Sequence, residues 1–268
     1  MALKRRAWAV LALAVMMSGA AARAADASTE ERERIRQVVK EVLREYAAHL
    51  GDRQAAPGAR AVLREIHQHN RAFARSRKPA YFAAFKDGQR PRATVVSCAD
   101  SRVHMHAFDA TPDNDLFVVR NIGNQIATAQ GSVEYGVRHL NTPLLLIVGH
   151  VACGAIRAAA GDYSAEPAAI RNELDRLAVP KDEPGLASIR LNVNHQVRHA
   201  MGLFEDRVLS GKLTVVGAIY DFRDELKEGA GRLVIVNVNG ETDRERLARL
   251  DLLRDLDKPA AGGRRATP

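Results

Sequence analysis

Cys98 and Cys153 are the only two cysteines in the chain, and each lies among other residues that can bind or assist a metal. Asp100 and Arg102 follow Cys98, and His150 stands three residues before Cys153. Two thiolates and one imidazole form the mixed sulfur and nitrogen donor set that suits zinc. Three protein ligands leave the fourth tetrahedral position open, which is typical of a catalytic rather than a structural zinc site.

Apolar runs in front of both motifs predict buried strands. Residues 93–96 (Ala-Thr-Val-Val) precede Cys98, and residues 143–148 (Pro-Leu-Leu-Leu-Ile-Val) precede His150. Residues 154–160 predict a helix, so His150 and Cys153 should share a strand-to-helix turn. Because open α/β folds place their sites at the carboxyl edge of a parallel sheet, we expect the three ligands to meet there.

The rest of the chain predicts a single α/β domain, with a central, mostly parallel sheet flanked by helices and an N-terminal helical extension. Residues 29–50 predict an amphipathic helix. This helix either packs on its own domain or, as we favour, reaches onto a partner subunit. Further elements are expected as follows: helices at 59–76, near 167–177, at 186–209 and near 243–256, and strands at 213–220 and 232–238.

The N-terminus has the features of a secretory signal peptide. A basic segment, an apolar core from Ala7 to Met17 and the small residues Ala22 and Ala24 predict cleavage after Ala24. The apolar core is too short for a membrane span, although an uncleaved anchor is the alternative. We therefore expect a periplasmic or secreted protein without a membrane span. The expected organisation is a signal peptide (1–24), an amphipathic helix (25–57), the α/β domain (58–257) and a disordered tail (258–268).

The net charge of +8 is concentrated at the two ends of the chain. Seven basic residues lie in the signal peptide or the tail: Lys4, Arg5, Arg6, Arg23, Lys258, Arg264 and Arg265. The remaining body is close to neutral. This argues against a nucleic-acid partner, which requires lysines and arginines clustered on one face.

Taken together, the two motifs resemble those of the β-class carbonic anhydrases. That family carries Cys-x-Asp-Ser-Arg at the end of one strand and His-x-x-Cys-Gly at the end of another. The resemblance is nearly continuous from Gln89 to Ile156 and includes residues 115–121 and 131–135. It implies one zinc ion per subunit and the reversible hydration of CO2 to bicarbonate and a proton by zinc-bound hydroxide.

The resemblance also assigns roles to individual residues. Cys98, His150 and Cys153 would bind zinc, Asp100 would accept the proton of the hydroxide, and Arg102 would hold Asp100 off the metal. In some members of the family the aspartate binds zinc as a fourth ligand at low pH, so Asp100 is also a candidate ligand.

The expected substrate pocket is apolar, in keeping with CO2 itself. The family pattern places Phe117, Ile122, Tyr135 and Gly154 there, together with Gln89, which a neighbouring subunit supplies to hydrogen-bond the bound anion. We therefore expect a homodimer or a larger homo-oligomer. Without the resemblance, Phe117 and Ile122 would be interpreted as core residues.

Several alternatives remain open at this point. A relative on the same scaffold could hydrolyse CS2 or COS, and a zinc-binding protein could lack catalysis, although it would need neither Asp100 nor Arg102. A Cys98–Cys153 disulfide is a further alternative, but it leaves His150 unexplained. His104 and His106 are interpreted as solvated loop residues rather than proton relays.

Some bacterial members of the family carry a tryptophan three residues before the first zinc cysteine. It helps to form a bicarbonate pocket that locks the aspartate onto zinc, and an arginine at the position of Arg120 partners it. This chain has Val95 at that position, and its only tryptophan is Trp8. We therefore expect an open site near neutral pH.

Overall fold

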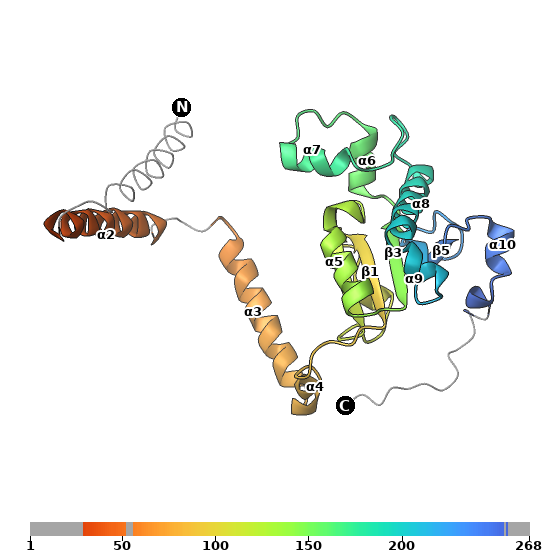
Figure 1. The fold of residues 1–268 in the computed structure, drawn as a ribbon, viewed down its shortest axis with the longest axis horizontal. Coiled ribbons are helices and arrows are strands. Elements are labelled where there is room, and N and C mark those ends of the chain that lie inside the picture. Colours follow the sequence, from red (N-terminus) through yellow and green to blue (C-terminus); the bar gives the residue numbers. More distant parts are fainter. Residues whose placement is uncertain (1–28, 52–55, 255, 257–268) are drawn as a thin grey trace. The chain divides into compact units, whose positions relative to one another are not determined.

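The computed structural model describes residues 29–51, 56–254 and 256 (Figure 1). The predicted signal peptide and the C-terminal tail lie outside these residues. The described chain divides into two compact units, with the boundary in sequence between Arg77 and Lys78. No helix in the described part of the chain has the length and apolar character needed to cross a membrane.

The first unit contains two long helices, α2 (Thr29–Gly51) and α3 (Ala59–Ser76), both at the predicted positions. Glu30 and Glu31 lie in the first turn of α2, where negative charge interacts favourably with the helix dipole. Large apolar side chains on the two helices are exposed, among them Val38 at 59% and Leu63 at 67%. Among the described residues of α3 none is buried, so these helices do not form a core of their own.

The second unit is built on a five-stranded sheet in the order β2-β1-β3-β4-β5. Its strands are β1 (Ala93–Cys98), β2 (Leu116–Asn121), β3 (Leu144–His150), β4 (Thr214–Asp221) and β5 (Arg232–Val238). The first four are parallel, and β5 pairs with β4 in the antiparallel direction. This arrangement confirms the predicted α/β fold with a mostly parallel sheet.

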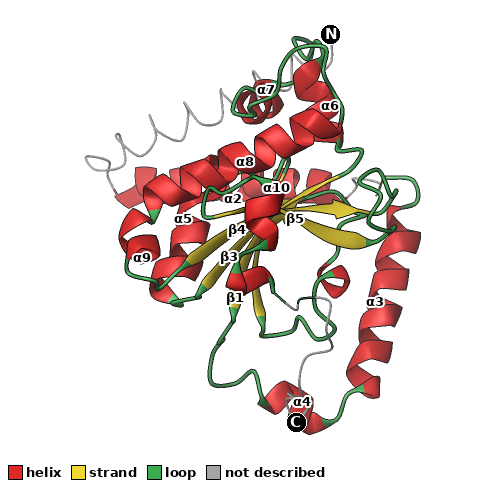
Figure 2. Ribbon diagram, turned by 90° about the vertical axis from the view of Figure 1, so that its right-hand side faces the viewer, coloured by secondary structure: helices red, strands yellow, loops and turns green. Residues whose placement is uncertain are grey.

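Every residue of β1 is buried, as expected for a parallel strand covered on both faces. Helix α8 (Leu186–Leu203) packs on one face of the sheet (Figure 2), where two strand glycines allow it to approach closely. A Cβ atom at Gly149 would lie 2.6 Å from a methyl group of Val193, and one at Gly217 would lie 2.7 Å from the same side chain. The close packing of α8 therefore depends on these glycines.

The remaining helices are short. They are α4 (Pro79–Ala83), α5 (Gln130–Glu134), α6 (Gly154–Ala160), α7 (Ala168–Leu174), α9 (Glu205–Leu209) and α10 (Arg244–Ala248). Single turns of 3-10 helix form η1 (Met105–Ala107), η2 (Ala127–Ala129) and η4 (Asp251–Leu253), and a π-helical segment forms η3 (Tyr135–His139).

Two predicted helices are interrupted. The helix expected at 186–209 breaks at Phe204, whose ring is fully buried and whose backbone (φ −122°, ψ 26°) is not helical. Arg138 donates to the carbonyl of Leu203 at this break and so satisfies a terminal acceptor. The helix expected at 243–256 ends at Ala248, because Leu250 is extended (φ −67°, ψ 130°) and joins α10 to η4. Leu247, Leu250 and Leu253 then all pack against Val216 and Val238.

Candidate metal centre

Cys98, His150 and Cys153 lie together at the carboxyl edge of the sheet, as their spacing predicts. Cys98 ends β1, His150 ends β3, and Cys153 directly precedes α6. All three are buried, and their ligand atoms lie within 4.8 Å of one another. Both cysteines are free thiols, so the disulfide alternative is not what the structure contains.

The hydrogen bonding of His150 suits a metal ligand. Its Nδ1 lies 2.9 Å from the carbonyl oxygen of Val151 and, since a carbonyl only accepts, must carry the proton. Nε2 then presents a lone pair, and this fully buried atom has no hydrogen-bond partner among the described residues. A buried polar atom without a partner is costly, and a bound cation would remove that cost. Two sulfurs and this nitrogen therefore fit zinc.

One of the two thiols, Cys98, is poised to lose its proton. A hydrogen bond from the Cys153 thiol, more than any other contact, lowers the pKa of Cys98 to about 4, against the opposing effect of burial. The backbone N–H groups of Gly123 and Asp100 add to this stabilisation. The pKa of Cys153 is raised by its hydrogen bond to Cys98 and by burial. One thiolate thus forms readily, and a divalent cation would favour the second.

Asp100 and Arg102 form a two-bond ion pair beside the triad. Arg102 donates from Nε to Oδ1 of Asp100 at 2.9 Å and from Nη2 to Oδ2 at 2.6 Å. Oδ2 also lies 3.7 Å from Nε2 of His150. Arg102 holds the pKa of Asp100 well below its usual range, chiefly through the side-chain hydrogen bonds. The carboxylate is therefore charged at neutral pH and lies beside the candidate ligand atom of His150.

Two contacts of Arg102 were not predicted from the sequence. Its Nη2 donates to the carbonyl oxygen of Ala152 at 3.1 Å, and its guanidinium carbon lies 5.0 Å from the ring centre of Phe222. Ala152 adopts a left-handed backbone (φ 51°), which is unfavourable for a residue with a Cβ atom. Neither contact has a local sequence signal, since both partners lie far along the chain.

Arg120 braces the loop that follows β1. Its Nη2 donates to the carbonyl oxygens of Cys98, Asp100 and Val103 at 3.0, 2.7 and 2.8 Å, and its Nε donates to Cys98 at 3.2 Å. The sequence relates Arg120 only to the arginine that partners the tryptophan in some bacterial relatives. In the structure it instead fixes the backbone that carries Cys98 and Asp100.

The predicted pocket residues fall into two groups. Ile122 packs in the same apolar cluster as Cys98 and Cys153, and Gly154 begins α6 immediately after Cys153. Phe117 and Tyr135 lie together instead, with ring centres 5.8 Å apart.

The sheet register separates this second group from the triad of the same chain. Phe117 pairs with Thr94 of β1, whereas Cys98 pairs with Asn121 at the other end of β2. Four strand residues span about 13 Å. Gln89 is exposed and precedes β1. A single chain therefore brings Ile122 and Gly154, but not Phe117, close to the metal ligands.

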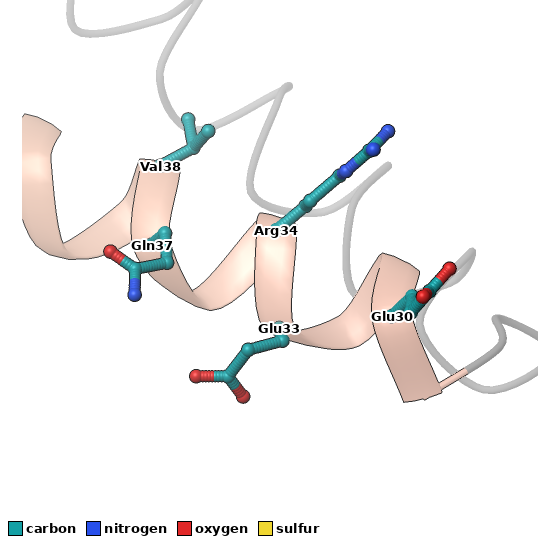
Figure 3. A pocket seen from close by; sticks show the side chains of 5 residues that line it. All are labelled: Glu30, Glu33, Arg34, Gln37 and Val38. Atoms are coloured by element: carbon teal, nitrogen blue, oxygen red, sulfur yellow. The ribbon is translucent and has the colours of Figure 1, made fainter.

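A separate surface hollow lies along α2 in the first unit (Figure 3). Five side chains of that helix line it: Glu30, Glu33, Arg34, Gln37 and Val38. Glu33 is paired with Arg36 at 3.3 Å, and both side chains are more than half exposed. This hollow has neither the burial nor the convergent ligand atoms of the Cys98, His150 and Cys153 group.

Comparison with known proteins decides the family. The family profile described as carbonic anhydrase matches residues 93–227, a range that contains all three candidate ligands, Asp100, Arg102 and Phe222. Carbonic anhydrase 2 of Mycobacterium tuberculosis is 31% identical over 156 residues, which cover 53% of this chain and 75% of that protein. The chain belongs to the β-carbonic anhydrase family.

Other β-carbonic anhydrases agree with this assignment. The chloroplastic β carbonic anhydrase 5 of Arabidopsis thaliana is 28% identical over 189 residues, which cover 61% of this chain and 63% of that protein. Among solved structures, a β-carbonic anhydrase described as tetrameric, from Sordaria macrospora, has a TM-score of 0.58 and 23% identity over 66% of this chain and 98% of its own. The Coccomyxa enzyme has a TM-score of 0.54 and 22% identity, over 74% and 95%. These two likenesses concern the fold.

Proposed function

We propose that this carbonic anhydrase binds one zinc ion per subunit through Cys98, His150 and Cys153 and catalyses the reversible hydration of CO2 to bicarbonate and a proton. The observation that carries the proposal is the buried triad with the Asp100–Arg102 pair on its open side. When bound, zinc lowers the pKa of a coordinated water to about 7 and so supplies the nucleophile.

Asp100 orients the nucleophile in this proposal. Its Oδ2 lies 3.7 Å from Nε2 of His150 and is therefore close to the open side of the ligand group. As a carboxylate it would accept a hydrogen bond from the attacking hydroxyl, so that an oxygen lone pair faces the carbon of CO2. Arg102 occupies both carboxylate oxygens from the other side and keeps the group in that orientation.

The apolar walls of the substrate pocket come from two sources in this proposal. Ile122 contributes from the same chain, since it packs in the cluster that contains Cys98 and Cys153. Phe117, Tyr135 and Gln89 are supplied by a neighbouring subunit, because the register pairs Phe117 with Thr94, four residues before Cys98 and so about 13 Å along the strand from it. The active protein is then a homodimer or a larger homo-oligomer.

Gln89→Ala tests this shared site. The exposed amide is outside the core of its own chain, so the variant should fold, keep zinc and remain oligomeric. We expect it to raise the KM for CO2 and to weaken anion inhibition. Sedimentation velocity at assay concentrations gives the oligomeric state. A wild-type protein that is fully active as a monomer would contradict the shared pocket.

The N-terminal sequence supports export to the periplasm or secretion. The basic segment, apolar core and small residues before Ala25 form a cleavable signal. N-terminal sequencing of protein recovered from the periplasmic fraction should begin at Ala25. Recovery of uncleaved protein with the membrane fraction would contradict this proposal.

Metal analysis combined with stopped-flow CO2 hydration tests the function. We expect one zinc per chain, hydration activity that is lost with a chelator, and recovery when zinc is added. Turnover of COS or CS2 without CO2 hydration would favour the related hydrolase. Stoichiometric zinc with neither activity would favour a non-catalytic zinc-binding protein.

A further inference from the structure

Phe222 lies between two functional groups of the site although it is neither a zinc ligand nor an acid or base. Its ring stacks against the imidazole of His150, with centres 6.1 Å apart and planes inclined by 27°. The guanidinium of Arg102 lies over the ring at 5.0 Å. A cation at this distance from an aromatic face is attracted by the ring quadrupole.

A rigid turn fixes the position of this ring. Phe222 follows Asp221, the last residue of β4, whose side chain is fully buried. Oδ2 of Asp221 accepts from the N–H of Leu226 at 2.6 Å, and Oδ1 accepts from the N–H of Arg223 at 3.1 Å. The ring itself is partly buried and packs against two core clusters, one of which contains Cys98 and Cys153. It is therefore a fixed surface.

Arg102 needs such a surface because its own side chain is about half exposed (48%). A long, flexible side chain in water loses rotamer freedom when it is held in one geometry, which is why exposed ion pairs contribute little. Arg102 nevertheless makes a two-bond side-chain contact with Asp100, and its backbone N–H also donates to Oδ1 of Asp100 at 3.0 Å. The guanidinium further contacts the Phe222 ring and the carbonyl oxygen of Ala152. The contact with the ring thus limits the guanidinium to positions from which it donates to both carboxylate oxygens of Asp100.

We propose that Phe222 is a positioning residue that holds Arg102 on Asp100 and thereby keeps Asp100 from binding the metal. This inference rests on the zinc site of the proposed function. Without the ring, the Asp100–Arg102 pair is weaker, and the carboxylate, already 3.7 Å from a candidate ligand atom, becomes available as a fourth ligand. Loss of Phe222 should therefore strengthen zinc binding while it weakens turnover, a combination that damage to the fold would not produce.

Phe222→Leu tests the proposal, since leucine keeps much of the apolar volume and removes the aromatic face. Two readouts do not involve CO2: zinc affinity, from competition with a chromophoric chelator, and solvent exchange of the Arg102 Nε–H, from NMR of the zinc-free protein. We expect zinc affinity to rise by about two- to tenfold and the Nε–H to exchange faster by a similar factor. CO2 hydration should fall by a similar factor, and Phe222→Tyr should restore all three.

Phe108→Leu is the matched control. Phe108 packs edge-on against Tyr220, with ring centres 5.4 Å apart, in one of the clusters that Phe222 joins. This variant should leave zinc affinity and Arg102 exchange unchanged. If Phe222→Leu fails to fold, Phe222→Met replaces it, because the flexible thioether fills irregular apolar space.

Several results would overturn the proposal. One is a parallel fall in zinc affinity and activity with unchanged Arg102 exchange, which would give Phe222 a packing role alone. Another is a failure of Phe222→Tyr to restore the wild-type values. Because zinc affinity and Nε–H exchange are measured without CO2, they decide the role of Phe222 even if the wild-type protein turns out not to hydrate CO2.

Discussion

The Oδ2 atom of Asp100 lies 3.7 Å from Nε2 of His150, yet Arg102 occupies both carboxylate oxygens. The carboxylate thus lies beside a candidate metal ligand, but both of its oxygens are hydrogen-bonded to Arg102. A group at this position can either accept a hydrogen bond from the nucleophile or become a ligand that blocks the metal site. In this structure the ion pair with Arg102 favours the first role.

Cys98→Ser should abolish zinc binding and CO2 hydration together, because a hydroxyl does not provide the thiolate that zinc prefers. Metal content per chain is the measurement. Ser97→Ala is the control. The Ser97 hydroxyl is buried with no hydrogen-bond partner among the described residues, so its removal should leave zinc and activity intact. Stoichiometric zinc in Cys98→Ser would show that Cys98 is not a ligand.

Asp100→Asn should retain zinc but lose about 10²-fold or more in kcat, the usual contribution of a positioned acid or base. The amide cannot accept the hydroxyl proton in the same way, and it pairs less well with Arg102. Zinc analysis and stopped-flow hydration on the same sample separate the two effects. Asp113→Asn is the control, since this exposed carboxylate bonds to Tyr81 rather than to the site. Near-normal turnover in Asp100→Asn would reduce Asp100 to a structural role.

Much of the fold could be predicted from sequence because its central strands are buried on both sides and read as continuous apolar runs. The runs before Cys98 and His150 gave β1 and β3, and these strands brought the predicted ligands together. The break at Phe204 could not be predicted, because it depends on an arginine 66 residues earlier that satisfies the end of α8. Periodicity reports which face of a helix is apolar, not where tertiary contacts end it.

The same limit applies to the site. Cys98, Asp100 and Arg102 are near neighbours in sequence, so their association is visible in a motif. Phe222 follows β4 and Arg102 follows β1, and β3 lies between these two strands in the sheet. Their contact therefore joins distant parts of the sequence, and no spacing rule predicts it. For Phe117, the family pattern predicts a place in the substrate pocket. In the structure, the register of β1 and β2 places Phe117 away from the candidate metal ligands of its own chain.

Gly217→Ala should destabilise the second unit by about 1–3 kcal/mol, the usual cost of overpacking. The added methyl would lie 2.7 Å from Val193 and 2.9 Å from Val197, two β-branched side chains with little freedom to move aside. The free energy of unfolding in urea is the measurement. Gly202→Ala on α8 is the control, because its Cβ would meet nothing within 4 Å and alanine favours the helix by about 1 kcal/mol. Equal stability of the two variants would contradict the close packing of α8.

Three observations bear on regulation by bicarbonate. The tryptophan that helps to form the bicarbonate pocket in some bacterial relatives is replaced by Val95, which is fully buried in the core. Arg120, at the position of the partnering arginine, already donates to the carbonyl oxygens of Cys98, Asp100 and Val103. Asp100 is held by Arg102 rather than released.

We therefore expect no cooperative inhibition by bicarbonate. Because Arg102 keeps the pKa of Asp100 well below its usual range, the carboxylate stays charged and paired throughout the neutral range. Activity should then follow a single, non-cooperative titration as the pH falls from about 8 to 7, as expected if the proposed zinc ion lowers the pKa of a bound water to about 7. Hydration rates across this range, with and without added bicarbonate, are the measurement. A steep loss of activity that bicarbonate deepens and higher pH relieves would mean that Asp100 leaves Arg102 for the metal, and that an anion site exists which Val95 and Arg120 do not form.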